Sequence, residues 1–202
     1  MLNVSANLEH HERVMRLAIQ EAERARGSTG DNPWVGAAIT DASGQVIALG
    51  HTQGPGEDHA EIVAMKRARA QGVMLDACTL YSTLEPCSFH GRTPACSRAI
   101  VDAGIRVLVT GIRDPNPRVD GLGLQSVRDA GVTLIEEVCV REITLQLADW
   151  IFRHHPHEPL RRASALMLAP GGSRQRTIEQ LGEYYGLELA RIEAVVDQLG
   201  AR

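Results

Sequence analysis

Three side chains that could bind a metal lie within residues 59–96. His59 is followed by a carboxylate at Glu61, and Cys87 and Cys96 stand on either side of a polar loop, SFHGRTPA. One imidazole and two thiolates suit zinc, which accepts both nitrogen and sulfur ligands. Three protein ligands leave the fourth tetrahedral position for water, and zinc lowers the pKa of that water toward about 7. The pattern therefore predicts a catalytic zinc site.

The carboxylate two residues after His59 is the natural proton carrier of such a site. A carboxylate beside a metal-bound water can accept its proton and then deliver it to a leaving amine. A structural alternative exists, because Asp58 and Glu61 also have the three-residue spacing of a capping box, in which Glu61 would bond only to backbone. Beside two suitably placed cysteines, the catalytic interpretation of Glu61 is favoured. Cys78 and Cys139 lie in apolar runs and are predicted to be buried thiols without a function.

Helical and strand-like patterns alternate over the first three quarters of the chain. Helices are predicted at 8–26, 58–70, 94–103, 122–130 and 137–154, and strands at 34–40, 45–49, 79–83, 105–110 and 132–135. Such alternation favours an α/β sandwich with helices on both faces of a mostly parallel sheet. The first two strands are separated by a short turn and would add one antiparallel pair.

The pattern changes after residue 155, so we divide the chain into a catalytic domain over 1–155, a linker over 156–176 and a small helical hairpin over 177–202. The linker holds two prolines in HHPHEPLRR and the flexible composition APGGSRQR. Two short helices around Gly186 account for the remainder. Their outline resembles a helix-turn-helix, but the segment 187–199 carries only Arg191 as a basic residue, so a hairpin that docks on the body or on a second subunit is favoured over DNA binding.

Composition excludes several classes of protein. The 202 residues are 44% hydrophobic and 23% charged, which is typical of a globular chain. No apolar run approaches a membrane span, and the N-terminus lacks a secretion signal. The net charge of −4 and the scarcity of aromatic residues argue against a general nucleic-acid binder. We therefore expect a cytoplasmic protein with no membrane partner.

Several motifs carry a resemblance to a known family. His59-Ala60-Glu61 and Pro86-Cys87 match the zinc deaminase signature H-x-E…P-C-x-x-C, although eight residues rather than two separate the cysteines. Four longer motifs occur along the chain in the order found in the family: NPWVG (32–36), GHTQGPGEDHAE (50–61), TLEPCSFHGRTPAC (83–96) and DPNPRVDGLG (114–123). Over about residues 8–155 the chain resembles the deaminase domain of the riboflavin biosynthesis protein RibD. The resemblance implies a zinc-dependent deaminase domain with the cytidine-deaminase-like fold, a three-layer α/β/α sandwich with a five-stranded mixed sheet.

The resemblance also implies roles for individual residues. One zinc ion per chain would be held by His59, Cys87 and Cys96, and Glu61 would be the catalytic proton carrier. The positions that match substrate-binding residues of the family are Asn32, His51, Arg92, Asp114 and Asn116. The Asn32 amide offers both a donor and an acceptor to a pyrimidine ring. Arg92 suits a phosphate, because a guanidinium can engage two oxygens at once. Asp114 and Asn116 have an alternative as turn formers, since DPNP is a strong turn sequence.

This chain departs from the family pattern at three places. Phe89 stands where the family usually has His, with His90 one place later, and the segment 51–59 is one residue longer than usual, which puts the place of His51 in doubt. The family's reductase domain does not fit into the residues that remain, so no NADPH is expected.

The reaction implied is the hydrolytic deamination of a phosphorylated ribosylaminopyrimidine. The chain would convert 2,5-diamino-6-(5-phosphoribosylamino)pyrimidin-4-one to 5-amino-6-(5-phosphoribosylamino)uracil and release ammonia, in riboflavin synthesis or in a related, toxoflavin-like pathway. The alternatives are a deaminase of another nucleobase or of tRNA, and a non-catalytic zinc protein in which His90 would be the fourth ligand. The fold usually assembles as oligomers, so a homodimer or homotetramer is expected.

Overall fold

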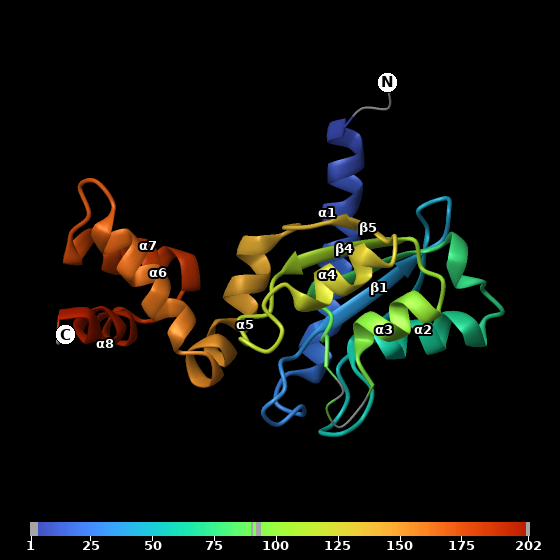
Figure 1. Cartoon of the computed structure of the whole chain (residues 1–202), viewed down its shortest axis with the longest axis horizontal. Coiled ribbons are helices and arrows are strands. Elements are labelled where there is room, and N and C mark those ends of the chain that lie inside the picture. Colours follow the sequence, from blue (N-terminus) through green and yellow to red (C-terminus); the bar gives the residue numbers. More distant parts are fainter. Residues whose placement is uncertain (1–3, 90, 92–93, 201–202) are drawn as a thin grey trace. The chain divides into compact units, whose positions relative to one another are not determined.

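The computed structural model describes residues 4–89, 91 and 94–200 of the chain (Figure 1). It divides into two compact units, Met1–Ile143 and Thr144–Arg202. The first unit contains the sheet and all of the predicted site residues. No helix among the described residues is long and apolar enough to cross a membrane.

The described residues of the first unit form five strands and the helices that cover them. The strands are β1 (Gly36–Thr40), β2 (Val46–His51), β3 (Thr79–Leu84), β4 (Val107–Ile112) and β5 (Thr133–Ile135). The α-helices that lie wholly in this unit are α1 (Val4–Ala22), α2 (Ala60–Ala70), α3 (Cys96–Asp102) and α4 (Leu122–Asp129). Two short 3₁₀ helices, η1 (Glu23–Ala25) and η2 (Leu75–Ala77), and the beginning of α5 (Val140–His154) complete it.

The five strands form one mixed sheet in the order β2-β1-β3-β4-β5. The predicted β1–β2 hairpin is present, with Ala38 opposite Leu49, but β1 is also antiparallel to β3, where Ala38 faces Tyr81. Only the β3–β4 and β4–β5 pairs are parallel, so the expectation of a mostly parallel sheet is wrong. The topology gives the reason. The crossover through α2 makes β3 parallel to β2, and β1 lies between these two strands and is antiparallel to both.

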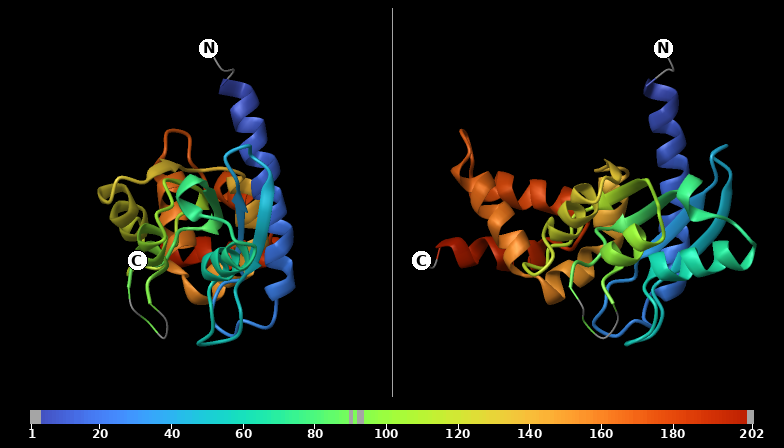
Figure 2. Two further views of the ribbon diagram at one scale, coloured as in Figure 1. Left: turned by 90° about the vertical axis from the view of Figure 1, so that its right-hand side faces the viewer. Right: turned by 45° about the vertical axis from the view of Figure 1, so that its right-hand side comes forward.

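The sheet separates two layers of helices, as the left view of Figure 2 shows for α1 on one side and α2 on the other. Helix α3 packs against both α2 and α4, which places these three helices in one layer. Central strands that are covered on both faces need apolar side chains without alternation. Every residue of β1 is accordingly buried, and Leu80 and Tyr81 of β3 are buried as well. The three-layer α/β/α sandwich with a five-stranded mixed sheet is therefore confirmed.

The second unit is helical. It comprises most of α5, α6 (His157–Leu168), α7 (Arg174–Tyr185) and α8 (Leu189–Gly200). The predicted hairpin around Gly186 is present, and this glycine ends α7 with a left-handed φ of 61°. The predicted linker over 156–176 is wrong for its first part, which is α6. Pro156 lies at the N-cap and Pro159 in the first turn, where a backbone N–H has no helical partner, so these prolines begin a helix and do not interrupt one.

Candidate metal centre and active site

The N-terminus of α2 supplies the imidazole and the carboxylate of the site. His59 is the N-cap of α2 in an extended conformation, and its carbonyl accepts a hydrogen bond from the N–H of Val63 at 3.0 Å. Glu61 lies in the first turn and is only 4% exposed. No described side chain caps this helix, and Asp58 pairs with Lys66. The capping-box arrangement that was the structural alternative for Glu61 is therefore not formed.

The packing of α2 on β2 depends on Gly50. A Cβ at this position would lie 2.4 Å from the carbonyl oxygen of Ala60 and 2.5 Å from the nitrogen of Ala64. Only a glycine allows the first turn of the helix to approach the strand so closely. This contact sets the position of the turn that carries both His59 and Glu61.

We expect Gly50→Ala to destabilise the first unit and to disturb the site. Overpacking of this kind costs about 1–3 kcal/mol, and the displaced first turn would carry His59 away from the two cysteines. Urea unfolding and the zinc content of the purified variant measure the two effects separately. A variant with the wild-type unfolding midpoint and full zinc content would contradict this account of the α2–β2 contact.

The three predicted metal ligands come together. The Nδ1 atom of His59 lies 3.4 Å from the Sγ atom of Cys96 and 3.7 Å from that of Cys87, and all three ligand atoms lie within 4.8 Å of one another. Tetrahedral zinc with its usual Zn–N and Zn–S bond lengths separates a nitrogen and a sulfur ligand by about 3.6 Å. The three side chains therefore fit this metal. Within the described part of the chain, no fourth His, Cys, Asp or Glu joins the cluster, and His90 lies outside the described residues.

The protonation of the site follows from burial and from its own hydrogen bonds. The hydrogen bond with the Cys96 thiol, together with one to His59, lowers the pKa of Cys87 to about 4, which favours the thiolate that a metal requires. The N–H of Cys96 also donates to the Cys87 sulfur at 3.3 Å. Burial raises the pKa of Glu61, and the nearby charge of His59 opposes this rise. Glu61 is thus a buried carboxyl group beside the ligands and not one of them.

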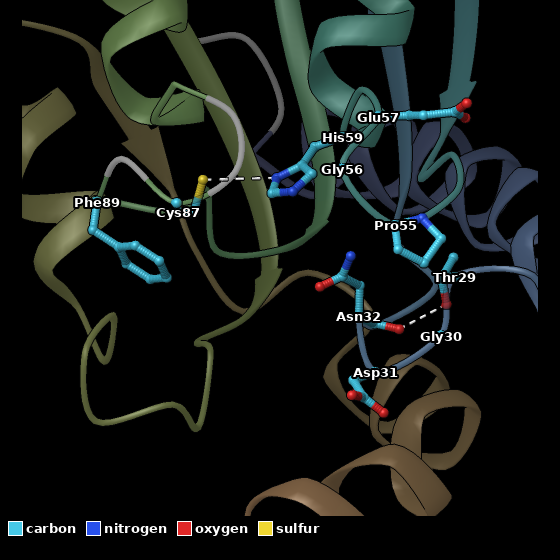
Figure 3. Close-up of a pocket in the computed structure, with 11 residues that line it drawn as sticks. Thr29, Gly30, Asp31, Asn32, Pro55, Gly56, Glu57, His59, Cys87 and Phe89 are labelled. Carbon is cyan, nitrogen blue, oxygen red and sulfur yellow. Dashed lines mark hydrogen bonds between the residues drawn. The ribbon is translucent and has the colours of Figure 1, made fainter.

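A pocket of about 390 Å³ opens beside the metal ligands. This volume is within the range of small-molecule sites. Figure 3 shows the Asn32 side chain directed into the space between His59 and Phe89. The Thr29 hydroxyl donates to the main-chain carbonyl of Asn32 at 2.7 Å and holds this loop in place. The described residues that line the pocket are Thr29, Gly30, Asp31, Asn32, Pro55, Gly56, Glu57, His59, Cys87, Phe89 and Gly91.

Phe89 lies at this pocket and is itself covered by a cation. The guanidinium of Arg118 lies 4.2 Å from the centroid of the Phe89 ring, a cation–π contact. The Ser88 hydroxyl donates to the carbonyl of Arg118 at 3.3 Å. The loop that contains Ser88 and Phe89 is therefore connected to the loop of Arg118 by two contacts. The sequence did not indicate Arg118, because its place in DPNPR is that of an ordinary turn residue.

The structure supports the remaining substrate-binding predictions less well. His51 ends β2, and its Nδ1 atom lies 2.8 Å from the Oε1 atom of Glu21, a buried carboxylate that also pairs with Arg67. His51 is not among the described residues that line the pocket. Arg92 lies outside the described residues. The roles of His51 and Arg92 therefore stay predictions.

Asp114 and Asn116 form the turn that was their alternative. The Oδ1 atom of Asp114 accepts from the N–H of Asn116 at 2.8 Å, and the Oδ1 atom of Asn116 accepts from the N–H of Arg118 at 3.0 Å. Burial raises the pKa of Asp114 to about 7. Neither residue is among the described pocket lining, so their contact with substrate also stays a prediction.

One buried residue next to the metal site was not predicted. Glu85 is 3% exposed and accepts hydrogen bonds from the backbone N–H groups of four residues, Asp114, Gly121, Gly123 and Leu124. A charged residue at the end of a predicted strand, directly before Pro86-Cys87, was the signal in the sequence.

Comparison with known proteins agrees with this geometry. The family described as "Cytidine and deoxycytidylate deaminase zinc-binding region" matches residues 8–112, which include all three ligands. The riboflavin biosynthesis protein RibD of Aquifex aeolicus is 37% identical over 155 residues, 75% of this chain and 42% of the relative. A Thermotoga maritima diaminohydroxyphosphoribosylaminopyrimidine deaminase/5-amino-6-(5-phosphoribosylamino)uracil reductase superposes with a TM-score of 0.71 at 36% identity, over 75% of this chain and 43% of that one.

A structure from a study of tRNA:A34 deaminases also superposes, with a TM-score of 0.52 at 28% identity over 67% of this chain and 99% of that one. The fold thus occurs in proteins that act on different substrates. This chain spans less than half the length of the Aquifex aeolicus and Thermotoga maritima proteins. The match over 8–112, together with the cluster of His59, Cys87 and Cys96, shows that the chain belongs to the cytidine and deoxycytidylate deaminase zinc-binding family.

Proposed function

We propose that this protein is a zinc-dependent hydrolytic deaminase of a phosphorylated ribosylaminopyrimidine. It converts 2,5-diamino-6-(5-phosphoribosylamino)pyrimidin-4-one to 5-amino-6-(5-phosphoribosylamino)uracil and releases ammonia. The observation that carries the proposal is the cluster of His59, Cys87 and Cys96 beside the buried Glu61, at the edge of a pocket of about 390 Å³. The similarity to RibD supports this choice of substrate.

The catalytic roles follow from the donor set. When bound by His59, Cys87 and Cys96, zinc supplies Lewis acidity and a water with a pKa of about 7. Glu61 accepts the proton of the attacking water and delivers it to the ring nitrogen next to the carbon that carries the amine. Glu61 then carries the remaining proton of the added hydroxyl group to the amine, and the C–N bond breaks to release ammonia as the carbonyl forms. A buried carboxyl group with a raised pKa suits both directions of transfer.

Recognition of the ring is assigned to Asn32. Its amide points into the pocket and can donate to a ring carbonyl while accepting from a ring N–H. Arg92 is proposed to bind the phosphate, and His51, Asp114 and Asn116 are proposed to contact the remainder of the substrate. Binding energy from the phosphate, remote from the reacting carbon, would orient the ring.

Ammonia release from three compounds tests the choice of substrate. We expect turnover of the phosphorylated diaminopyrimidine, a lower kcat/KM for its dephosphorylated form, and no turnover of cytidine. If Arg92 binds the phosphate, Arg92→Ala lowers kcat/KM for the phosphorylated compound to the wild-type value for the dephosphorylated compound. The kcat/KM for the dephosphorylated compound should not change in this variant. If cytidine were the one compound of the three that released ammonia, the proposed substrate would be wrong, but the assignment of the protein as a deaminase would stand.

Further properties belong to the same proposal. One zinc ion per chain is expected from the single cluster among the described residues. Because the reaction is a hydrolysis and changes no oxidation state, it needs no NADPH. We propose that the protein is a homodimer or homotetramer in the cytoplasm. We also propose that it acts in riboflavin synthesis or in a toxoflavin-like pathway that uses the same intermediate.

A further inference from the structure

The Glu85 carboxylate joins two segments that are distant in the sequence. Its Oε2 atom accepts from the N–H groups of Asp114 at 3.3 Å and Gly121 at 2.9 Å. Its Oε1 atom accepts from those of Gly123 at 2.9 Å and Leu124 at 3.2 Å. A buried carboxylate that accepts four backbone hydrogen bonds is held rigidly at both of its oxygens.

These donors are the groups that need such an acceptor. Gly121 is the N-cap of α4, and Gly123 and Leu124 lie in its first turn, where backbone N–H groups have no partner within the helix. Gly121 has no side chain that could cap the helix. The N-terminus of α4 is therefore capped by Glu85, which precedes Gly121 by 36 residues. The helix dipole adds to the attraction for a negative charge at this end.

The same contacts restrain Cys87, the metal ligand two residues after Glu85. A Cβ at Gly123 would lie 1.9 Å from the carbonyl oxygen of Pro86, so α4 also contacts the residue between Glu85 and Cys87. On the other side of the ligand, the Ser88 hydroxyl donates to the carbonyl of Arg118. Residues 85, 86 and 88 are thus all in contact with the segment 114–124.

We propose that Glu85 is a positioning residue, which fixes the Cys87 thiolate relative to the other metal ligands by anchoring the Glu85–Ser88 segment to α4 and the Asp114 turn. Its effect on the reaction rests on the proposed function, whereas its effect on the metal ligand does not. Replacement by Gln leaves one acceptor oxygen and directs an amide donor toward two N–H donors. The anchor would then open, and Cys87 would be free to shift.

Cobalt in place of zinc reports the position of Cys87 without any substrate. The variants are Glu85→Gln and Gly123→Ala, which perturb the anchor from opposite sides, and Val127→Ala is the matched control. Val127 is fully buried in α4, so its truncation weakens the packing of the same helix and leaves the Glu85 hydrogen bonds in place. The measurements are the visible and thiolate-to-cobalt absorption bands, the affinity for cobalt and the thermal midpoint.

We expect Glu85→Gln and Gly123→Ala to shift the cobalt bands and to weaken metal binding by about 10–100-fold, the usual effect of residues that orient metal ligands. Val127→Ala should lower the thermal midpoint with a wild-type spectrum and affinity. If Glu85→Gln does not fold, Glu85→Asp takes its place, because the shorter carboxylate cannot reach all four N–H groups.

If the folded Glu85 and Gly123 variants had the cobalt absorption bands and cobalt affinity of the wild-type protein, the proposal would be wrong, because Glu85 would then only stabilise α4. The proposed substrate can fail without this result changing, since the wild-type protein would then bind cobalt normally but release no ammonia.

Discussion

Glu61→Gln should lower turnover by about 10²- to 10⁴-fold, the usual contribution of a general acid–base group, without loss of zinc. Glu61 is not among the three clustered ligands, so its replacement leaves the metal site intact. The amide of Gln has nearly the same shape as the carboxyl group, but it can neither carry the proton of the attacking water to the ring nitrogen nor carry a proton to the leaving amine. Ammonia release and zinc content, measured on the same preparation, separate the two effects.

Asp58→Asn is the matched control for Glu61→Gln. Asp58 precedes the same helix and pairs with Lys66 at the protein surface. If Glu61 acted only through its negative charge near His59 and not through proton transfer, the two variants would resemble each other in stability and activity. Near wild-type turnover in Glu61→Gln would remove Glu61 from its proposed role.

Cys87→Ala should abolish both high-affinity zinc binding and activity. Two ligands remain, and neither the tetrahedral geometry nor the Lewis acidity of the site survives. The variant should also lose the stability that zinc gives the folded chain, about 2.7 kcal/mol when zinc is present at 100 times its Kd. Differential scanning calorimetry with and without a chelator measures this loss. The wild-type midpoint should fall on chelation, and that of Cys87→Ala should not change.

Cys78→Ala provides the control for the loss of a thiol. Cys78 is buried, and its sulfur contacts the carbonyl of Met74 at 3.4 Å, away from the metal cluster. This variant should keep its zinc and its activity, with only a modest change in stability. Full zinc content in Cys87→Ala would show that a different set of residues holds the metal.

The ligand cluster was predictable because its signals are local. His59 and Glu61 are two residues apart at the start of one helix, and both cysteines flank one loop, so residue types and spacing suffice to indicate a zinc site. The three-layer α/β/α architecture was predictable for the same reason, because the alternation of helices and strands is a local pattern in the sequence. Prolines misled the prediction at α6, because a proline in a first helical turn and one in a linker look alike in sequence.

The remaining features depend on contacts between distant segments. Glu85 reaches the N-terminus of α4 through hydrogen bonds to residues up to 39 positions away, which no local pattern shows. The pairing of His51 with Glu21 spans 30 residues, and it directs the His51 imidazole toward a residue that was not predicted to belong to the site. The antiparallel partner of β1 likewise follows from the crossover through α2 and not from the strand sequences.

Titration of metal-free protein with zinc, while ammonia release from the phosphorylated diaminopyrimidine is followed, tests the central claim most directly. The rate should be negligible without metal, rise in proportion to added zinc, and level off at one zinc ion per chain, because His59, Cys87 and Cys96 form the single cluster found among the described residues. A full rate without zinc, or a fully loaded protein that releases no ammonia, would contradict the assignment of this site as a zinc-dependent deaminase of that substrate.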